Sequence, residues 1–206
     1  SACMFELTFL NKQIKIWSMK RLFDLSCSIL GIVILAVPVL LLVYLVRSRL
    51  GSPVFFTQVR PGLNGKLFRM VKFRSMTNER SPDGELLPDA HRLTRFGALL
   101  RSTSLDELPE LWNVLKGDMS LIGPRPEQEK FVEQFAEQIP SYPYRHLVRP
   151  GLTGWAQVQH GYADNADSTR IKLSYDLYYV AHYSLALDLL IAAQTVKTVF
   201  TGFGAR

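Results

Sequence analysis

The chain has 206 residues, 48% hydrophobic and 20% charged, so it can bury a one-domain core and is neither a disordered nor a collagen-like chain. Its two cysteines, Cys3 and Cys27, lack metal-binding spacing, which argues against a structural zinc site or a disulfide framework. The formal net charge of +6 favours anionic partners, namely nucleic acid, acidic lipid or phosphorylated small molecules.

Most of the positive charge surrounds the most apolar part of the chain. Residues 1–60 carry seven Lys or Arg against two acidic residues. Within them, residues 25–46 form a run of 22 residues without a formal charge, long enough to cross a bilayer as a helix. A cleaved signal peptide is disfavoured, because the run is too long and no small-residue cleavage pattern follows it. A membrane segment is favoured over the remaining alternative, a buried core helix.

The middle of this run contains Pro38, which removes a backbone donor and bends or breaks a helix. Cations flank both ends, Lys20 with Arg21 and Arg47 with Arg49, so the positive-inside rule gives no direction across the membrane. A helix that enters one leaflet, bends and returns to the same face satisfies both observations. Kinked spanning helices also contain proline, so a spanning arrangement stays open.

Beyond residue 47 the sequence predicts a compact, irregular domain that is mostly α with a small β element. Residues 53–58 and 67–76 are predicted strands, joined by turns at Pro61-Gly62 and Asn64-Gly65. A polar loop follows over 78–90. The predicted helices, some of them amphipathic and suited to a membrane surface, cover 93–100, 108–116, 127–139, 170–182 and 185–200.

Two adjacent carboxylates, Asp106 and Glu107, precede Pro109. Proline is tolerated in the first turn of a helix, so both carboxylates are expected at a helix N-terminus, where negative charge is stabilised. Ser104 and Glu107 also fit a capping box, and Asp106 fits an N-cap, so a purely structural role stays open. Adjacent helical residues point about 100° apart. One carboxylate could therefore attack an electrophile while the other holds a cation.

Several cations accompany these carboxylates. Arg101 lies five residues before the first of them, and Arg125 lies in a rigid Gly-Pro-Arg-Pro turn. Lys72 and Arg74 add two cations from a predicted strand. A lone arginine is usually a solvated surface residue, but carboxylates with several cations beside a membrane segment predict a phosphate-handling site.

With these motifs the chain resembles the bacterial monotopic phosphoglycosyl transferases, over about nine-tenths of its length. The resemblance rests on blocks that occur in one order, at residues 20–24, 57–62, 72–76, 101–109, 111–120, 123–126, 149–155 and 176–180. The tail over 198–206 is similar to the catalytic end of larger, exopolysaccharide-type members. Since the first residue is Ser rather than Met, we expect a fragment of such a protein.

The resemblance implies transfer of a sugar-1-phosphate from a UDP-sugar to polyprenyl (undecaprenyl) phosphate, with release of UMP. It implies an N-terminal extension over 1–19, a re-entrant membrane helix over 20–50 and a catalytic domain over 51–206. It places that domain among membrane lipids on the cytoplasmic face of the bacterial inner membrane, with Mg²⁺ as cofactor and no nucleic-acid partner. The role would be the first membrane step of glycoconjugate or exopolysaccharide assembly.

The resemblance also implies roles for individual residues. Asp106 would be the nucleophile that forms a covalent phospho-sugar ester, and Glu107 would be a magnesium ligand. Lys72, Arg101, Arg125 and Asp176 would line the phosphate and nucleotide site. One departure is Val37 before the proline of the membrane helix, where many members have serine.

Two other classes of protein stay open. A non-catalytic membrane module that binds anionic lipid or nucleic acid explains the charge and the apolar run, but gives Asp106 and Glu107 no purpose. A membrane-anchored phosphatase that uses Asp106 would release phosphate and form no lipid product. UMP release in the presence of polyprenyl phosphate separates the transferase from both.

Overall fold

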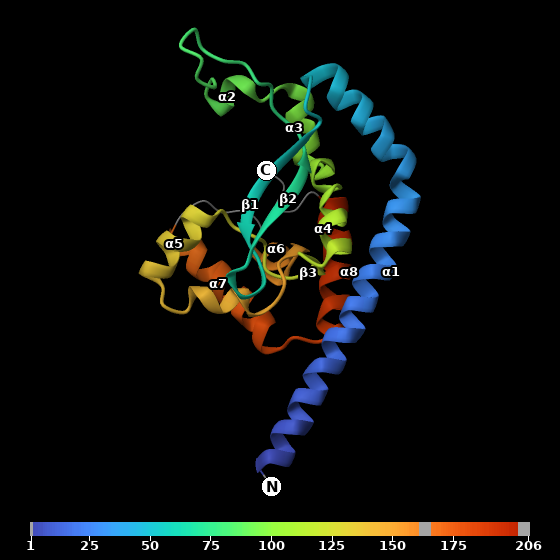
Figure 1. Ribbon diagram of the computed structural model, residues 1–206, viewed down its shortest axis with the longest axis vertical. Helices are drawn as coiled ribbons and strands as arrows, with labels where there is room; N and C mark the ends of the chain where they lie inside the picture. The colour runs from blue at the N-terminus through green and yellow to red at the C-terminus, as the bar shows by residue number, and fades with distance from the viewer. Residues whose placement is uncertain (1, 161–165, 202–206) are drawn as a thin grey trace.

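One long helix, α1 (Ala2–Leu50), forms the N-terminal quarter of the computed structural model, which describes residues 2–160 and 166–201, with side chains over 16–160 and 168–198. Within the described chain, residues 16–50 of α1 are the one helical stretch long and apolar enough to cross a membrane by length and composition. The helix continues through Pro38 and curves in its second half toward α3 (Arg95–Ser102) (Figure 1). Residue 20 was the expected boundary between an N-terminal extension and the membrane helix, and α1 continues through it without a break.

The residues of α1 that face the rest of the protein recur about every fourth position, as helical periodicity requires. The buried residues among them are Lys20, Asp24, Ser28, Leu42, Val46 and Leu50. The opposite face is apolar and exposed, at Leu22, Ile29, Leu30, Val33, Ile34, Val37, Leu40, Leu41 and Tyr44. A helix that exposes so much apolar surface is typical of contact with lipid or with another protein.

The two ends of the apolar run contact the same globular domain. Near its start, Lys20 and Asp24 bond to β3 (Ser120–Ile122). Near its end, Val46 packs in a buried cluster with Phe73 and Leu100. The predicted bend and return to one membrane face agrees with this packing but stays a prediction.

A β-hairpin follows α1, as predicted. Strands β1 (Phe55–Pro61) and β2 (Leu67–Phe73) pair antiparallel, and a single 3₁₀ turn, η1 (Leu63–Gly65), joins them. Asn64 and Gly65 both adopt positive φ in this turn, which explains the Asn-Gly pair at that point. The hairpin presents Lys72 near the end of β2.

The remaining predicted helices are confirmed to within a few residues, except that α7 begins four residues early. They are α3, α4 (Glu110–Lys116), α5 (Glu129–Gln138), α7 (Ala166–Ala181) and α8 (Leu185–Thr201). Gly117 ends α4 with φ 89°, the left-handed cap that glycine adopts most easily. The tail beyond residue 201 lies outside the described residues. The chain is therefore mostly helical with small sheets, as predicted.

Several short elements had not been predicted. They are α2 (Asp89–Arg92), η2 (Leu105–Glu107), η3 (Tyr142–Leu147), α6 (Trp155–His160), β3 and β4 (Gly151–Thr153). Strands β3 and β4 pair in parallel, with α5 and η3 in the connection between them. Three-residue strands are too short to show an alternating pattern, so no pattern in the sequence indicated this pair.

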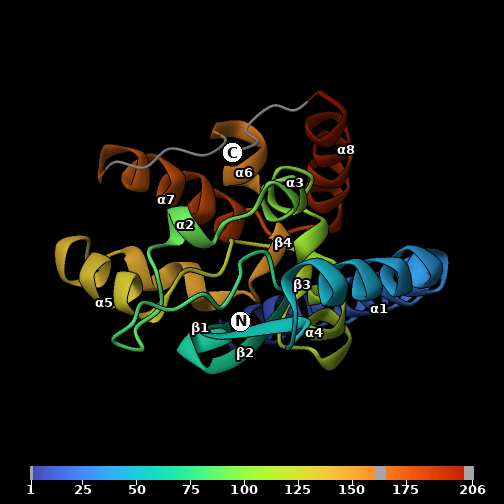
Figure 2. The same ribbon diagram turned by 90° about the horizontal axis from the view of Figure 1, so that it is seen from above.

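Among the residues with described side chains, the buried apolar residues form three clusters. Leu100 and Phe73 pack against the second half of α1, whereas Val114 and Met119 pack under β2. A third cluster joins β3 to α7 and α8. Figure 2 shows α5 on the side of the molecule remote from α1, with β3 and β4 between them.

Candidate functional site

The two carboxylates lie in η2, a single 3₁₀ turn, and not at the N-terminus of an α-helix. Ser104 begins this turn in the left-handed conformation, with φ 54°, and its side chain makes no capping hydrogen bond. The capping-box prediction is therefore wrong: the backbone N–H of Glu107 donates to the carbonyl of Ser104, at 3.1 Å. Helix α4 begins only at Glu110, after Pro109 at its N-cap.

The carboxylate of Glu107 is held by two cations. The guanidinium of Arg125 donates to both of its oxygens, to Oε2 at 3.2 Å and to Oε1 at closer range. Lys72 Nζ also donates to Oε1, at 2.7 Å. Burial alone would raise the pKa of Glu107, but Arg125 and then Lys72 outweigh it and lower the pKa to about 2. Glu107 is therefore ionised at every physiological pH.

Asp106 differs from its neighbour in its environment. Its side chain is buried, and burial followed by the charge of Glu107 raises its pKa above the usual range of aspartate. Lys72 and Arg101 act in the opposite direction and favour the ionised form. A poorly solvated carboxylate suits a nucleophile, because little hydration has to be removed before it attacks.

Arg101 reaches this site from the last turn of α3. Its Nε donates to Ser75 Oγ at 2.9 Å, which fixes the direction of the guanidinium. The helix approaches Ser75 closely: a Cβ at Gly97 would lie 1.7 Å from the Ser75 carbonyl oxygen. Glycine at position 97 therefore allows the packing that brings Arg101 near Asp106.

Lys72 is shared between two carboxylates, and sequence reasoning had missed the second. Its Nζ lies 3.1 Å from Oε1 of Glu110, which is 1% exposed. Asn113, one turn further along α4, accepts from the Val71 N–H at 3.0 Å and donates to the Arg69 carbonyl at 2.7 Å. These two bonds fix β2 on α4 and so place Lys72 over the carboxylates. No signal in the sequence indicated this role, because the burial of Glu110 and Asn113 follows from the fold.

Arg125 projects from a turn whose backbone is bonded on several sides. The N–H of Gly123 donates to Thr153 at 2.9 Å, and the N–H of Gly151 donates to Pro124 at 3.0 Å. A Cβ at Gly123 would lie 2.3 Å from the carbonyl oxygen of Arg149, so the segment after β3 approaches the segment before β4 too closely for a side chain there. The turn is therefore rigid, as the Gly-Pro-Arg-Pro sequence predicted.

Two arginines bond to carbonyl oxygens of this turn. Arg145 Nη2 donates to Arg125 O at 2.8 Å, and Arg60 Nη1 donates to Pro126 O at 3.1 Å. Asp176 is buried and binds Arg145 through Oδ2, at 2.7 and 3.1 Å. Asp176 therefore contacts Arg145, which in turn donates to the carbonyl of Arg125. Among the described residues, no contact joins Asp176 to Asp106 or Glu107. Arg74 donates to the carbonyl of Ser52 and also stands apart from Glu107.

The residues that could hold a metal ion are few. Across residues 16–160 and 168–198, no three His, Cys, Asp or Glu side chains are arranged to hold a metal ion by themselves. Mg²⁺ is commonly bound through one or two carboxylates together with substrate phosphates. The hard oxygen atoms of Glu107 fit that mode, in which a bound diphosphate supplies further ligands.

Lysine and arginine beside buried carboxylates are groups that can bind phosphate, and the exposed apolar face of α1 is suited to contact with lipid. Comparison with known proteins then gives the family: the model for bacterial sugar transferases matches residues 15–202, and the chain belongs to that family. The family predicted from the sequence motifs is thereby confirmed.

Individual relatives agree with this assignment. The chain is 49% identical over 189 residues to a UDP-N-acetylgalactosamine-undecaprenyl-phosphate N-acetylgalactosaminephosphotransferase of Aeromonas hydrophila, covering 91% of this chain and 45% of the relative. It is 48% identical over 186 residues to the uncharacterized sugar transferase EpsL of Bacillus subtilis, covering 90% of this chain and 89% of that protein. It is 40% identical to a UDP-glucose:undecaprenyl-phosphate glucose-1-phosphate transferase of Klebsiella pneumoniae, covering 89% of this chain and 40% of that protein. The chain thus spans less than half the length of the first and third of these relatives.

Proposed function

We propose that this protein transfers a sugar-1-phosphate from a UDP-sugar to polyprenyl phosphate, such as undecaprenyl phosphate, and releases UMP. The observation that carries the proposal is the pair of adjacent carboxylates in different environments: Asp106 is buried and has a raised pKa, whereas Glu107 is ionised and held by Lys72 and Arg125. The named activities of the relatives supply the substrate classes. The reaction would be the first membrane step of glycoconjugate or exopolysaccharide assembly.

In the first half-reaction, a carboxylate oxygen of Asp106 attacks the β-phosphorus of the UDP-sugar. The new P–O bond forms while the bond from this phosphorus to the bridging oxygen breaks, and UMP leaves with the electron pair. A phospho-sugar ester stays on Asp106. Lys72, Arg101 and Arg125 stabilise the negative charge on the transferring oxygens, because cations that are already in place need no reorganisation in the transition state.

In the second half-reaction, a phosphate oxygen of the polyprenyl phosphate attacks the same phosphorus. The bond to Asp106 breaks, the carboxylate is regenerated, and polyprenyl diphosphate-sugar is the product. A covalent intermediate divides one difficult step into two and lets a single site serve a soluble and a lipid substrate in turn.

Glu107 would hold Mg²⁺ together with the diphosphate of the bound UDP-sugar. When bound there, the metal would screen the diphosphate charge that otherwise repels an anionic nucleophile. The strong ionisation of Glu107 supports this role, since a ligand carboxylate has to be deprotonated. Lys72 and Arg125 keep the same carboxylate oriented toward the site.

The membrane arrangement that we propose is re-entrant. Residues 20–50 enter and leave the cytoplasmic leaflet of the bacterial inner membrane, bending near Pro38, and membrane lipids contact the exposed apolar face of α1. The contact of both ends of the apolar run with one globular domain supports it. A helix that spans would place one of those ends on the far side of the membrane, away from that domain. A UDP-sugar in the cytoplasm and a lipid phosphate at the interface would then meet at one site.

The proposal is tested with purified protein in lipid nanodiscs, undecaprenyl phosphate and a panel of UDP-sugars that includes UDP-N-acetylgalactosamine and UDP-glucose. We expect UMP release that depends on the lipid phosphate, and transient labelling of the protein by a sugar-phosphate carrying ³²P at the β-position. Asp106→Asn should abolish both turnover and labelling. Release of inorganic phosphate without a lipid product would instead identify a phosphatase, and binding without UMP release would identify a non-catalytic module.

A further inference from the structure

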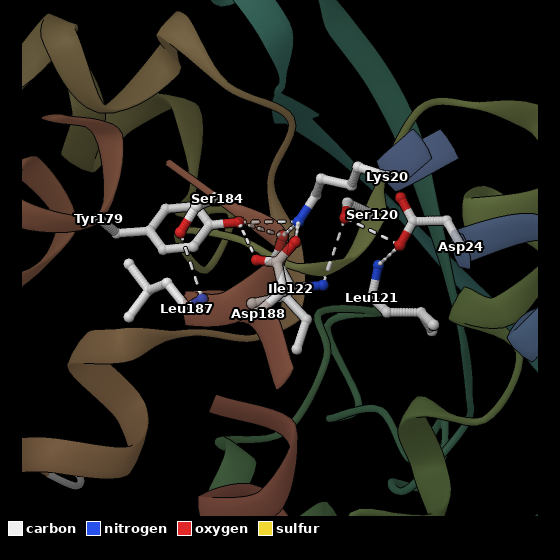
Figure 3. Close-up of polar contacts among 9 residues, drawn as sticks. All are labelled: Lys20, Asp24, Ser120, Leu121, Ile122, Tyr179, Ser184, Leu187 and Asp188. Carbon is white, nitrogen blue, oxygen red and sulfur yellow. Dashed lines mark hydrogen bonds and ion pairs between the residues drawn. The ribbon is translucent and has the colours of Figure 1, made fainter. Parts of the chain in front are cut away.

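A buried ion pair joins the start of the apolar helix to the last helix of the described chain (Figure 3). Lys20 Nζ of α1 lies 2.6 Å from Asp188 Oδ2 of α8, and the two side chains are 6% and 1% exposed. Removing two charges from water is costly, and a well-packed apolar pair is often equally stable. Stability alone therefore does not explain why an ion pair occupies this position.

The ion pair is part of a network that converges on one backbone carbonyl. Lys20 also donates to Tyr179 OH at 2.8 Å, and the Tyr179 hydroxyl donates to Asp188 Oδ1 at 2.7 Å. Both Lys20 Nζ, at 2.9 Å, and Tyr179 OH, at 3.1 Å, lie within hydrogen-bond distance of Ile122 O (Figure 3). Two of these side chains, from α1 and α7, thus contact the last residue of β3, and Asp188 of α8 holds both of them in place.

One turn further along α1, a second carboxylate holds the rest of the same strand. Asp24 Oδ1 accepts from Ser120 Oγ at 3.1 Å and from the Leu121 N–H at 3.0 Å. The side chain of Asp24 is fully buried. Helix α1 therefore fixes three successive residues of β3 by polar contacts, with apolar packing around them.

Strand β3 leads directly into the turn that carries Arg125. Only Gly123 and Pro124 separate Ile122 from Arg125, and the turn is bonded to β4 on its other side. A displaced Ile122 carbonyl would consequently move the Arg125 backbone. A guanidinium that binds both oxygens of a carboxylate demands a fixed direction as well as a short distance, so a small displacement weakens its contact with Glu107.

We propose that Lys20, together with Asp188 and Tyr179, is a positioning group that aligns Arg125 with Glu107. In this arrangement α1 is part of the scaffold of the active site as well as a membrane element. None of the three side chains contacts Asp106 or Glu107 in the described structure, so they act through the β3 backbone. The effect on turnover rests on the proposed function, whereas the effect on the position of the turn does not.

The structural consequence is tested by hydrogen exchange, measured by mass spectrometry on the whole chain in lipid nanodiscs. Lys20→Met removes the charge, and Tyr179→Phe removes only a hydroxyl. We expect both to raise the exchange rate of the amides over 121–125 by about tenfold, because the strand loses its anchors.

Arg21→Met is the matched control, since Arg21 is the adjacent cation of α1 but donates to the carbonyls of Val114 and Leu115 in α4. It should leave the exchange rate of residues 121–125 unchanged. Unchanged exchange in both Lys20→Met and Tyr179→Phe would overturn the proposal. Should Lys20→Met fail to fold, Tyr179→Phe alone decides the matter, because it preserves the ring and its packing.

The catalytic consequence is tested by a double-mutant cycle on the rate of UMP release. Lys20→Met should lower kcat by about tenfold in the native background, but by less than about twofold when Arg125 is already lysine, because both changes then disturb the same contact. An equal loss in both backgrounds would mean that Lys20 does not act through Arg125, and would overturn the proposal. If no UDP-sugar supports turnover in the native protein, the proposed function fails, while hydrogen exchange still decides the positioning role.

Discussion

Arg125 binds both carboxylate oxygens of Glu107, although the two residues lie 18 positions apart on different elements. The pairing needs the 3₁₀ turn η2 on one side and the turn after β3 on the other. Neither residue is held by its own element alone. The reaction that we propose therefore depends on how the backbone around each of them is fixed.

Arg125→Lys tests the geometry of this pair rather than its charge. Lysine keeps the positive charge but cannot donate two parallel hydrogen bonds to a carboxylate. We expect kcat for UMP release to fall by about a hundredfold, because a preorganised donor is lost in the transition state. The melting temperature should change little, since Arg125 is partly exposed. Arg80→Lys, on the exposed loop before α2, is the control and should retain full activity. Full activity of Arg125→Lys would show that charge alone is sufficient at position 125.

Chelation should stop UMP release, and added Mg²⁺ should restore it. Glu107→Gln keeps the shape of the side chain but removes the charge that a hard cation requires. We therefore expect the Mg²⁺ concentration for half-maximal activity to rise by about tenfold or more. Asp89→Asn removes a carboxylate that pairs with Arg92 on α2, and it should leave the Mg²⁺ dependence unchanged. If Glu107→Gln shows the native dependence, then Glu107 serves only to hold Lys72 and Arg125.

The pH dependence of kcat/KM should report on Asp106 in the free enzyme. Its carboxylate has to be ionised to attack, so activity is lost as the pH falls through its pKa, which burial and then Glu107 raise above the usual value. Arg101 lowers this pKa, so Arg101→Met should raise it further and move the acid limb to higher pH. Arg95→Met, at the other end of α3, should leave the limb in place. An acid limb that does not move in Arg101→Met would contradict the assignment of this limb to Asp106.

Close backbone packing at Gly123 should make any side chain destabilising there. Gly123→Ala would place a methyl group 2.3 Å from the Arg149 carbonyl oxygen, so β3 and β4 would have to separate. We expect a loss of about 1–3 kcal/mol in the free energy of unfolding, together with lower activity because Arg125 moves. Gly31→Ala is the matched control: its methyl group would lie 3.7 Å from Leu111, an ordinary contact, within a helix that favours alanine. Equal stability of the two variants would show that the strands can separate freely.

The parts of the fold that could be predicted from the sequence are those with a local signal. The Asn-Gly turn between two predicted strands indicated the hairpin. The parallel pair β3 and β4 could not be predicted, because three-residue strands carry no periodic pattern and their pairing depends on contacts between distant segments. The partners of Lys20 could not be predicted either, because they also come from distant segments. A lysine at the edge of an apolar run is expected to contact a lipid headgroup, whereas Lys20 is buried against Asp188.

The candidate site shows the same division. Motif blocks were sufficient to predict Asp106, Glu107, Lys72 and Arg125 as neighbours, and the structure brings these four together. Glu110 and Arg145 were missed, because each is an ordinary charged residue until the fold buries it. The direct contacts of Asp176 are with Arg145, which no spacing in the sequence could indicate.

The topology of α1 should be decided by cysteine accessibility, with single cysteines at positions 18 and 48 in a background that lacks Cys3 and Cys27. Both native serines are exposed, so the substitutions disturb little packing. The two positions lie on either side of Pro38, at the two ends of the apolar run. A straight helix would separate them by about 45 Å, enough to place them on opposite sides of a membrane. A re-entrant helix keeps both on the cytoplasmic face, beside the domain that Asp24 and Val46 contact.

We therefore expect neither cysteine to react with an impermeant thiol reagent in intact spheroplasts, and both to react once the inner membrane is opened. Labelling of position 18 in intact spheroplasts, with position 48 protected, would show that α1 spans the membrane. In that case the observed packing of residues 20 to 28 on β3 and α8 could not exist in the membrane-bound protein, so this labelling experiment also tests the anchoring of the Arg125 turn by α1.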